Sequence, residues 1–113
     1  MMVMREPTYY TLAALLNGPL HGYAIIKRAA ELSGGRVRLA AGTLYAALDR
    51  LTAAELVRAE REEVVNGRAR RYYRLTDAGR HALEAEAARM AEASRVVIGR
   101  ARQRRPTPGT RPA

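Results

Sequence analysis

The stretch of sequence that decides the fold is residues 41–76, AGTLYAALDRLTAAELVRAEREEVVNGRARRYYRLT. In its first half, Leu44, Leu48 and Leu51 recur at intervals of four and three residues, which places their side chains on one face of a helix. We therefore predict a helix over about residues 41–54 with this leucine stripe buried. The residues expected to lie away from the stripe are Thr43, Ala46, Ala47 and Arg50.

The second half of the stretch predicts a β-hairpin. Asn66-Gly67 is a strong signal for a two-residue hairpin turn. Residues 56–62 before it and residues 71–75 after it have the composition of strands. The segment between them is too charged to lie in a core. Its charged residues are Glu62, Glu63, Arg68, Arg70 and Arg71.

A first helix is predicted upstream, over about residues 8–16. Leu12, Leu15 and Leu16 share one face of it. The sequence Asn-Gly-Pro at residues 17–19 then ends the helix, because glycine and proline both interrupt helical backbone.

A second helix is predicted from about residue 21 to residue 32. Tyr23, Ile26 and Ala30 repeat at helical spacing within it, and a Ser-Gly-Gly sequence ends it. Residues 36–39 alternate polar and apolar side chains, which suits a short strand or an extended link.

A long helix is predicted after the hairpin. Thr76 is a good N-cap residue for its start. Leu83, Met90 and Val97 repeat every seven residues, a weak heptad compatible with packing against a partner helix. We expect this helix to fray after Arg100.

The predicted fold is mainly α with a small β-hairpin. Three helices followed by a two-stranded hairpin form a winged helix-turn-helix, to which a long C-terminal helix is added. The expected division is a winged-helix domain at residues 1–75, a dimerisation helix at residues 76–102 and a disordered basic tail at residues 103–113.

The charge balance indicates a polyanionic partner. The 113 residues include 20 basic and 11 acidic side chains, a formal net charge of +9. Lys27 is the only lysine, and arginine binds phosphate in a fork and also reads guanine, so nucleic acid is the favoured partner. Codon bias in a GC-rich genome explains the arginine excess equally well.

Other classes of protein receive little support. The absence of cysteine excludes disulfides and thiolate metal sites, and no apolar run approaches the roughly 18 residues of a membrane span. His21 and His81 are far apart in the sequence, and no glycine-rich phosphate loop is present. We therefore expect a cytoplasmic protein without secretory signal, metal or cofactor, and not an enzyme.

The start of the helix over residues 41–54 is the first candidate DNA contact. In helix-turn-helix proteins the recognition helix presents its N-terminal residues to base edges. Gly42 would let the backbone approach a phosphate, while Thr43 and Tyr45 offer hydroxyl groups. A plain three-helix core with Thr43 as a cap and Tyr45 half-buried fits the spacing equally well. Arg50, further along the helix, is a further candidate.

The hairpin is the second candidate. A positive β-ribbon beside a groove neutralises phosphates, and such binding weakens with salt. Arg68, Arg70 and Arg71 are the residues expected to make these contacts. The alternative is a solvated turn. The arginine-rich C-terminal end either adds DNA affinity or serves only solubility.

Three motifs, in this order, resemble the PadR family of transcriptional regulators over about residues 8–85. The motifs are His21-Gly22-Tyr23, then Gly42-Thr43-Leu44-Tyr45 with Leu48 and Leu51, then Tyr72-Tyr73-Arg74-Leu75-Thr76-Asp77-Ala78-Gly79. The resemblance implies an N-terminal winged helix, a C-terminal dimerisation helix that packs against the partner's first helix, and repression of a nearby promoter. It also implies that Gly42, Thr43 and Tyr45 lie at DNA and that wing residues lie on the backbone.

Two residues depart from the family pattern. Ala46 stands where the family usually has proline, which should not harm a helix. Glu55 stands where the family usually has glycine in the turn before the wing. Such a glycine often takes positive φ, which glutamate accepts reluctantly. The turn at Glu55 is therefore the part of the resemblance that most needs a structure.

The expected function is that of a homodimer that binds a pseudo-palindromic operator in double-stranded DNA and represses transcription. Its two recognition helices would lie one DNA turn, roughly 34 Å, apart. A small aromatic or apolar effector would release it. The candidate residues for an effector pocket are Tyr9, Tyr10, Met90 and Val97, for which core packing is the alternative role. The rival function is that of a basic dimeric protein-interaction module that does not bind DNA.

Overall fold

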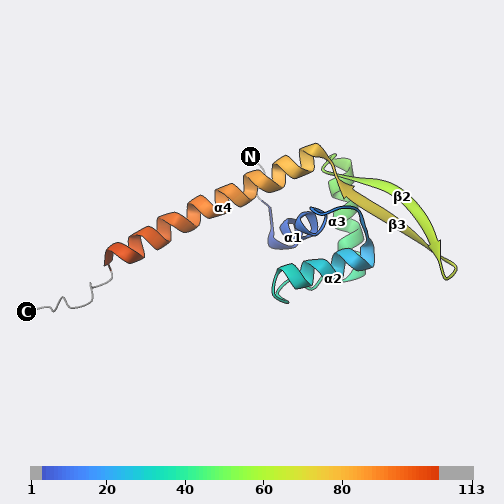
Figure 1. The fold of residues 1–113 in the computed structure, drawn as a ribbon, viewed down its shortest axis with the longest axis horizontal. Coiled ribbons are helices and arrows are strands. Elements are labelled where there is room, and N and C mark those ends of the chain that lie inside the picture. Colours follow the sequence, from blue (N-terminus) through green and yellow to red (C-terminus); the bar gives the residue numbers. More distant parts are fainter. Residues whose placement is uncertain (1–3, 105–113) are drawn as a thin grey trace, which may run out of the picture.

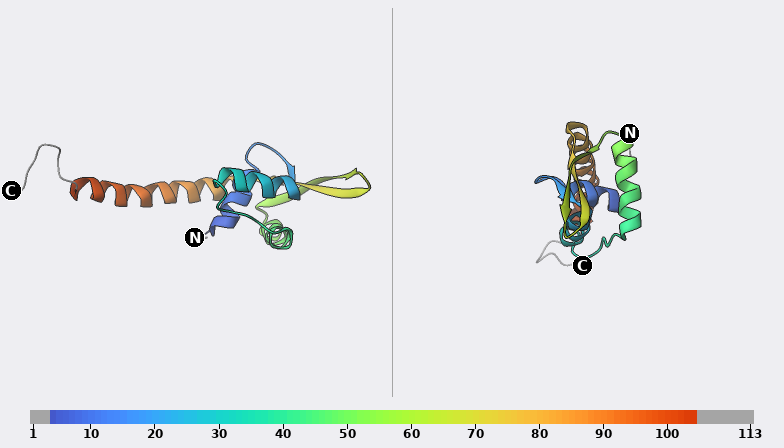
Figure 2. Two further views of the ribbon diagram at one scale, coloured as in Figure 1. Left: turned by 90° about the horizontal axis from the view of Figure 1, so that it is seen from below. Right: turned by 90° about the vertical axis from the view of Figure 1, so that its right-hand side faces the viewer.

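The computed structural model describes residues 4–104 of the chain. Four helices and a small antiparallel sheet make up this part, and the longest helix projects away from the rest (Figures 1 and 2). The elements are α1 (Glu6–Ala14), β1 (Leu20–His21), α2 (Gly22–Leu32), α3 (Ala41–Ala53), β2 (Val57–Val65), β3 (Arg68–Leu75) and α4 (Asp77–Arg104). This order confirms the predicted winged helix followed by a long helix.

Helix α1 buries the apolar face that the spacing predicted, except at its end. Leu12 and Leu15 are fully buried, but Leu16 is 39% exposed. The helix ends at Ala14, and Leu15 is already its C-cap, so Leu16 no longer follows the helical spacing. The expectation that all three leucines share one buried face was wrong for Leu16.

Helix α2 turns a different face inward from the one predicted. Its buried residues are Gly22, Ile25 and Ala29, whereas Tyr23 is 74% exposed. Helix α2 packs against α1, and Ile25 and Ala29, the residues just before Ile26 and Ala30, are the fully buried ones. Ile26 is partly buried against the core. A tyrosine at helical spacing is a weak guide to this face, since its hydroxyl tolerates water.

Helix α3 has the leucine stripe that the sequence predicts. Leu44, Leu48 and Leu51 are all buried. Ala47 is buried with them, contrary to expectation, because it follows Leu44 by three residues and widens the same stripe. The extended link 36–39 contains no strand, although Val37 is buried and its N–H donates to Ser33 Oγ over 2.8 Å.

The sheet has three strands in the order β1-β3-β2, one more than predicted. Leu20 and His21 of β1 pair with Tyr73 and Tyr72 of β3. A strand of two residues is too short to show alternation in the sequence. The pairing of β1 with β3 links the residues just before α2 to the wing.

The hairpin is longer than predicted, reaching Val65 on one side of the turn and Arg68 on the other. Asn66 and Gly67 have φ values of 52° and 76°, as a two-residue hairpin turn requires. Pairing therefore continues to the tip with a bulge near Ala59. The charged residues beside the turn were left out of the predicted strands because their charge excludes them from a core. The wing extends into solvent, so its strands can carry these charges without burying them (Figure 1).

The turn before the wing takes positive φ. Glu55 has a φ of 62°, so glutamate occupies a conformation that favours glycine. Thr76 ties this turn to α4: its hydroxyl donates to Glu55 O over 2.6 Å and accepts from Gly79 N over 2.9 Å. The predicted N-cap role of Thr76 is confirmed.

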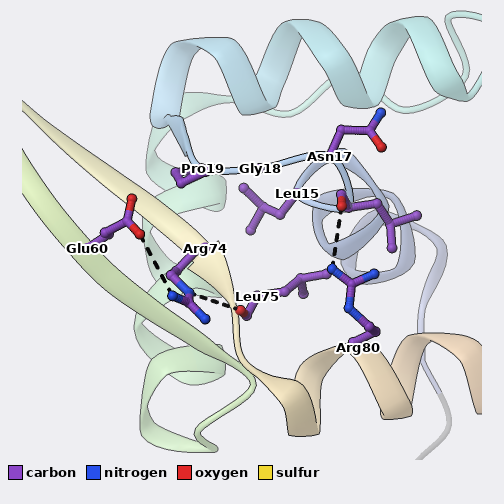
Figure 3. Close-up of a pocket in the computed structure, with 9 residues that line it drawn as sticks. Leu15, Asn17, Gly18, Pro19, Glu60, Arg74, Leu75 and Arg80 are labelled. Carbon is purple, nitrogen blue, oxygen red and sulfur yellow. Dashed lines mark hydrogen bonds and ion pairs between the residues drawn. The ribbon is translucent and has the colours of Figure 1, made fainter.

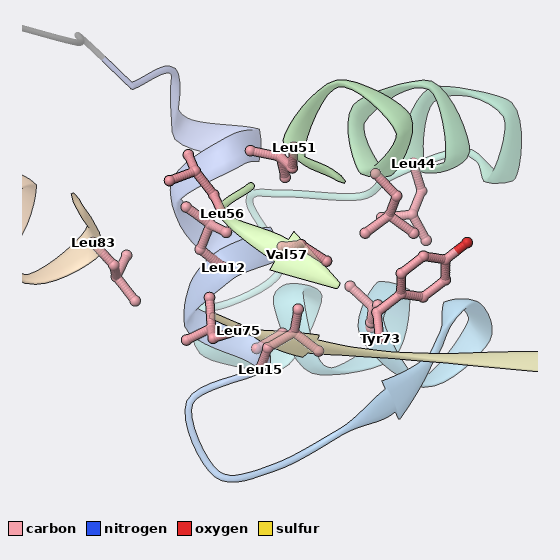
Figure 4. Packing of buried hydrophobic residues seen from close by; sticks show 12 residues of the cluster. Leu12, Leu15, Leu44, Leu51, Leu56, Val57, Tyr73, Leu75 and Leu83 are labelled. Atoms are coloured by element: carbon pink, nitrogen blue, oxygen red, sulfur yellow. The ribbon is translucent and has the colours of Figure 1, made fainter. Parts of the chain in front are cut away.

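Helix α4 runs to Arg104, so residues 103–104 are helical where a tail was expected; residues 105–113 of that tail lie outside the described residues. Leu83 joins the core, which gathers α1, α3, the sheet and the start of α4 (Figure 4). Met90 and Val97, the next members of the heptad, are exposed. None of the helices in residues 4–104 is long and apolar enough to cross a membrane.

Candidate nucleic-acid interface

A cleft of about 410 Å³ lies where the start of α2, helix α3 and the wing meet. We call it the wing cleft, and we call Arg68, Arg70 and Arg71 the wing arginines. The residues that line it are His21, Gly22, Tyr23, Tyr45, Arg68, Ala69, Arg70 and Arg71. The start of α2 and the wing are distant in the sequence, and the pairing of β1 with β3 brings them together at this cleft.

Tyr45 reaches the cleft because Gly22 has no side chain. A Cβ added at Gly22 would collide with the hydroxyl and ring carbons of Tyr45. The ring of Tyr45 is thus held against the α2 backbone, with the side chain 46% exposed. Its hydroxyl lies against Gly22 at the start of α2, and the wing arginines line the same cleft.

The first turn of α3 is open to solvent. Its N-cap is Ala40, which has no side chain to satisfy the first amides, and Gly42 and Thr43 are exposed. Thr43 therefore is not the helix cap that the alternative reading required. Uncapped amides at a helix start favour an anion. Arg50 is also exposed, but it lies in the last turn of α3, well away from this end.

The wing arginines are all exposed on β3. Arg71 lies 3.9 Å from Glu62, a weak surface pair. Within residues 4–104, neither Arg68 nor Arg70 forms an ion pair. The tip of the wing therefore presents positive charge that the described part of the chain does not neutralise.

His21 is the histidine that lines the cleft. Its Nδ1 accepts from Ala24 N over 3.4 Å, so it caps α2, as the sequence indicated for a helix-start residue. Its ring lies edge-on to Tyr72 with centroids 5.4 Å apart. Burial, reinforced by the charge of Arg70, holds the pKa of His21 below its usual value, and Glu63 opposes this shift.

A second hollow, of about 310 Å³, lies between the α1–β1 loop, the sheet and the start of α4 (Figure 3). Two arginines line it, and both bind groups of the chain. Arg74 lies 3.8 Å from Glu60 and donates to Leu75 O, while Arg80 donates to Leu16 O over 3.5 Å. These contacts join the wing, α1 and α4.

The four candidate effector residues are divided between two helices. Tyr9 and Tyr10 on α1 pack edge-to-face with ring centroids 5.4 Å apart, and Tyr9 also packs on the core. Met90 and Val97 lie on the projecting part of α4. Within residues 4–104 no group of His, Asp and Glu side chains is arranged to hold a metal ion.

Residues 11–85 match the family model described as the transcriptional regulator PadR-like family. The chain belongs to the PadR-like family. Its curated relatives include the transcriptional regulator Rv3488 of Mycobacterium tuberculosis, 48% identical over 69 residues, which are 61% of this chain and 64% of that protein. An uncharacterized 37.1 kDa protein in transposon TN4556 of Streptomyces fradiae is 51% identical over 83 residues, 74% of this chain. The chain spans less than two thirds of either relative, 64% and 22%.

Solved structures of PadR-like regulators share this fold. A PadR-like transcription factor from Bacteroides fragilis is 30% identical with a TM-score of 0.68, covering 81% of this chain and 86% of that one. A PadR family regulator from Clostridium difficile R20291 is 25% identical with a TM-score of 0.70, covering 84% and 97%. Bacillus subtilis PadR, solved in complex with operator DNA, is 24% identical with a TM-score of 0.67, covering 96% and 54%.

The sequence proposed seven DNA contacts, and six of these residues lie in the wing cleft or at the start of α3. Of its candidates, Tyr45, Arg68, Arg70 and Arg71 meet in the wing cleft, and Gly42 and Thr43 lie at the exposed start of α3. It did not propose Tyr23 or His21, which also line the cleft. The signal that could have found them was the motif His21-Gly22-Tyr23, whose polar rings flank a glycine.

Proposed function

We propose that this PadR-like protein regulates transcription by placing α3 in a DNA groove while the wing cleft holds the adjacent backbone. The observation that carries the proposal is the meeting of Tyr45, the start of α2 and the wing arginines in one cleft. A net charge of +9 supports it, as does the operator-bound structure of Bacillus subtilis PadR. Gly42 and Thr43 would approach the groove.

A DNA-binding titration over a series of salt concentrations tests this function. Arg70→Ala should weaken binding to any duplex and make the salt slope shallower by roughly one unit, because one phosphate contact is lost. Arg28→Ala is the matched control, since Arg28 lies further along α2 and pairs with Glu31 at 3.9 Å. An unchanged affinity and slope for Arg70→Ala would refute the wing's role. Absence of any salt-sensitive binding by the unaltered protein would favour a protein-interaction module.

We further infer that the functional unit is a cytoplasmic homodimer formed through α4. Exposed apolar side chains at Met90, Val96, Val97 and Ile98 support this, since a single helix in solvent gains nothing from them. Two winged helices would then read the halves of a palindromic operator about one DNA turn apart. Repression of the bound promoter is part of this proposal.

We also propose that a small aromatic or apolar effector binds between α4 and the partner's α1. The edge-to-face pair of Tyr9 and Tyr10 offers an aromatic surface, and Met90 and Val97 offer apolar ones. Such a ligand shifts the dimer only by its differential affinity for the two forms. Calorimetric titration of aromatic ligands into the dimer tests the pocket, and no heat from any of them would remove it.

A further inference from the structure

His21 and Tyr23 both line the wing cleft, and the helix cap that His21 forms does not account for the position of Tyr23. His21 caps α2 through Nδ1 only. Because Nδ1 accepts this bond, the proton of the neutral ring is on Nε2, which is a donor. Tyr23 is 74% exposed at the first turn of α2, an unusual position for a tyrosine that contributes nothing to the core.

The groups around His21 come from every element that meets it. On β3 these are Tyr72, which pairs with it, and the wing arginines; on β2 there is Glu63; on α3 there is Tyr45. The guanidinium group of Arg61, on β2, lies over the ring of Tyr72, 4.1 Å from its centroid. Arg61 pairs with Glu60 and Glu63, and Arg71 pairs with Glu62, so within residues 4–104 the cations of the cleft without an ion pair are Arg68 and Arg70. Their charges favour an anionic ligand in the cleft and disfavour a charged imidazole.

We propose that the wing cleft seats a phosphate of the DNA backbone, that His21 and Tyr23 contact it beside the wing arginines, and that DNA binding draws a proton onto His21. This inference rests on the proposed function, since it requires DNA at this face. Tyrosine hydroxyls, ring nitrogens and arginine side chains are ordinary donors to phosphate oxygens. Contacts of this kind position the protein on DNA without reading its sequence.

The direction of the pH effect follows from the charges. In the free protein, burial and Arg70 keep the pKa of His21 below 6.5. A phosphate in the cleft stabilises the imidazolium and raises that pKa, so the complex binds more protons than the free protein. The neutral ring already carries a proton on Nε2, so the added proton goes to Nδ1, which then gives up its 3.4 Å bond from Ala24 N. DNA affinity must then increase as pH falls through the raised pKa. Each unit of increase in the pKa strengthens binding by at most about tenfold.

The test is a binding titration at constant low salt between about pH 8 and about pH 6, the range over which histidine titrates. The probe is a rhodamine-labelled, mixed-sequence DNA duplex of about 30 base pairs, because phosphate contacts need no particular operator. The informative variant is His21→Asn, since asparagine retains the N-cap of α2. The control is His81→Asn, which alters the other histidine of the chain, exposed on α4.

Wild type and His81→Asn should bind several-fold more tightly at the acidic end of this range, whereas His21→Asn should show a flat profile. Tyr23→Phe should lose roughly three- to tenfold in affinity on every duplex, because only a hydroxyl contact to the backbone is removed. Equal thermal unfolding midpoints exclude misfolding as the cause. A His21→Asn profile as steep as that of the wild type overturns the inference while leaving DNA binding intact. Failure of the wild type to bind at any pH overturns the proposed function itself.

Discussion

Gly22 shows at the residue scale how a missing side chain shapes the interface. The hydroxyl of Tyr45 occupies the space that a Cβ would take, so the first residue of α2 determines where a ring of α3 lies. Tyr45 was expected at the groove as part of the recognition helix. The structure places it in the wing cleft, against the start of α2 and together with the wing arginines.

Replacing Glu55 with glycine should stabilise the protein. Glu55 has a φ of 62°, a conformation that costs an L-residue roughly 1–2 kcal/mol. Glycine adopts it freely but loses about 0.5–1 kcal/mol through the greater freedom of its unfolded chain. The free energy of unfolding should therefore rise by about 0.5–1 kcal/mol in urea denaturation.

Asn66→Gly is the control for this change, because Asn66 also has positive φ but asparagine tolerates it. Its stability should change much less than that of Glu55→Gly. A Glu55→Gly protein less stable than the wild type would show that the side chain of Glu55 makes a contribution larger than the strain.

The contacts between the base of the wing and the first turn of α4 determine how these two elements are oriented relative to each other. Thr76 N donates to Leu56 O over 3.1 Å, and the Thr76 hydroxyl binds both Glu55 O and Gly79 N. The first turn of α4 therefore lies directly on the backbone before β2, closer than a side chain would allow. A Cβ added at Gly79 would overlap the carbonyl group of Leu56. The direction in which α4 leaves the winged helix depends on this contact.

Two glycine-to-alanine changes in α4 should have opposite effects. Gly79→Ala should lower the free energy of unfolding by about 1–3 kcal/mol, because the contact with Leu56 must open. Gly99→Ala should raise it by up to about 1 kcal/mol, since alanine is the better helix former. An added Cβ at Gly99 meets nothing within 4 Å. Chemical denaturation of both variants compares them, and a harmless Gly79→Ala would refute the close-packed joint.

The whole molecule is a compact winged helix with one long projecting arm. Only the first turns of α4 pack on the core through Leu83, and the helix then continues to Arg104 without neighbours from the described part of its own chain (Figures 1 and 2). At 28 residues it extends about 42 Å. An arm of this length that carries valine and isoleucine fits a second copy of the chain.

Val97→Glu should dissociate the proposed dimer. Val97 is 67% exposed in the protomer, so the change should leave the protomer's own stability nearly unaltered. Burial of a valine contributes about 1.5–3 kcal/mol, so the dimer dissociation constant should rise at least about tenfold. Sedimentation velocity measures it, and DNA affinity should fall with it.

Arg95→Gln is the matched control because it changes the net charge by the same amount from the opposite side of α4. Arg95 is exposed and pairs with Glu92 at 2.7 Å. The control should remain dimeric. Equal dissociation constants for the two variants would place the dimer contact elsewhere.

The sequence by itself determined the order of the elements and indicated four of the residues that line the wing cleft. The leucine stripe of α3, the Asn66-Gly67 turn and the Thr76 cap are local signals, since each depends on backbone preferences or spacing within a few residues. The conformation at Glu55 is different: the sequence left it open, because glutamate stands where the family usually has glycine, and the structure shows positive φ. Periodicity was less informative for α2, where Tyr23 and Ile25 compete for the buried face.

Only the tertiary structure decided which of these residues meet. Strand β1 is two residues long, and its pairing with β3 joins parts of the chain about fifty positions apart. No local pattern specifies such a pairing, because its energy comes from the completed sheet and core. It is this pairing that brings His21 to Arg70 and Tyr45 to the wing, and that turns an arginine-rich hairpin into one wall of a cleft.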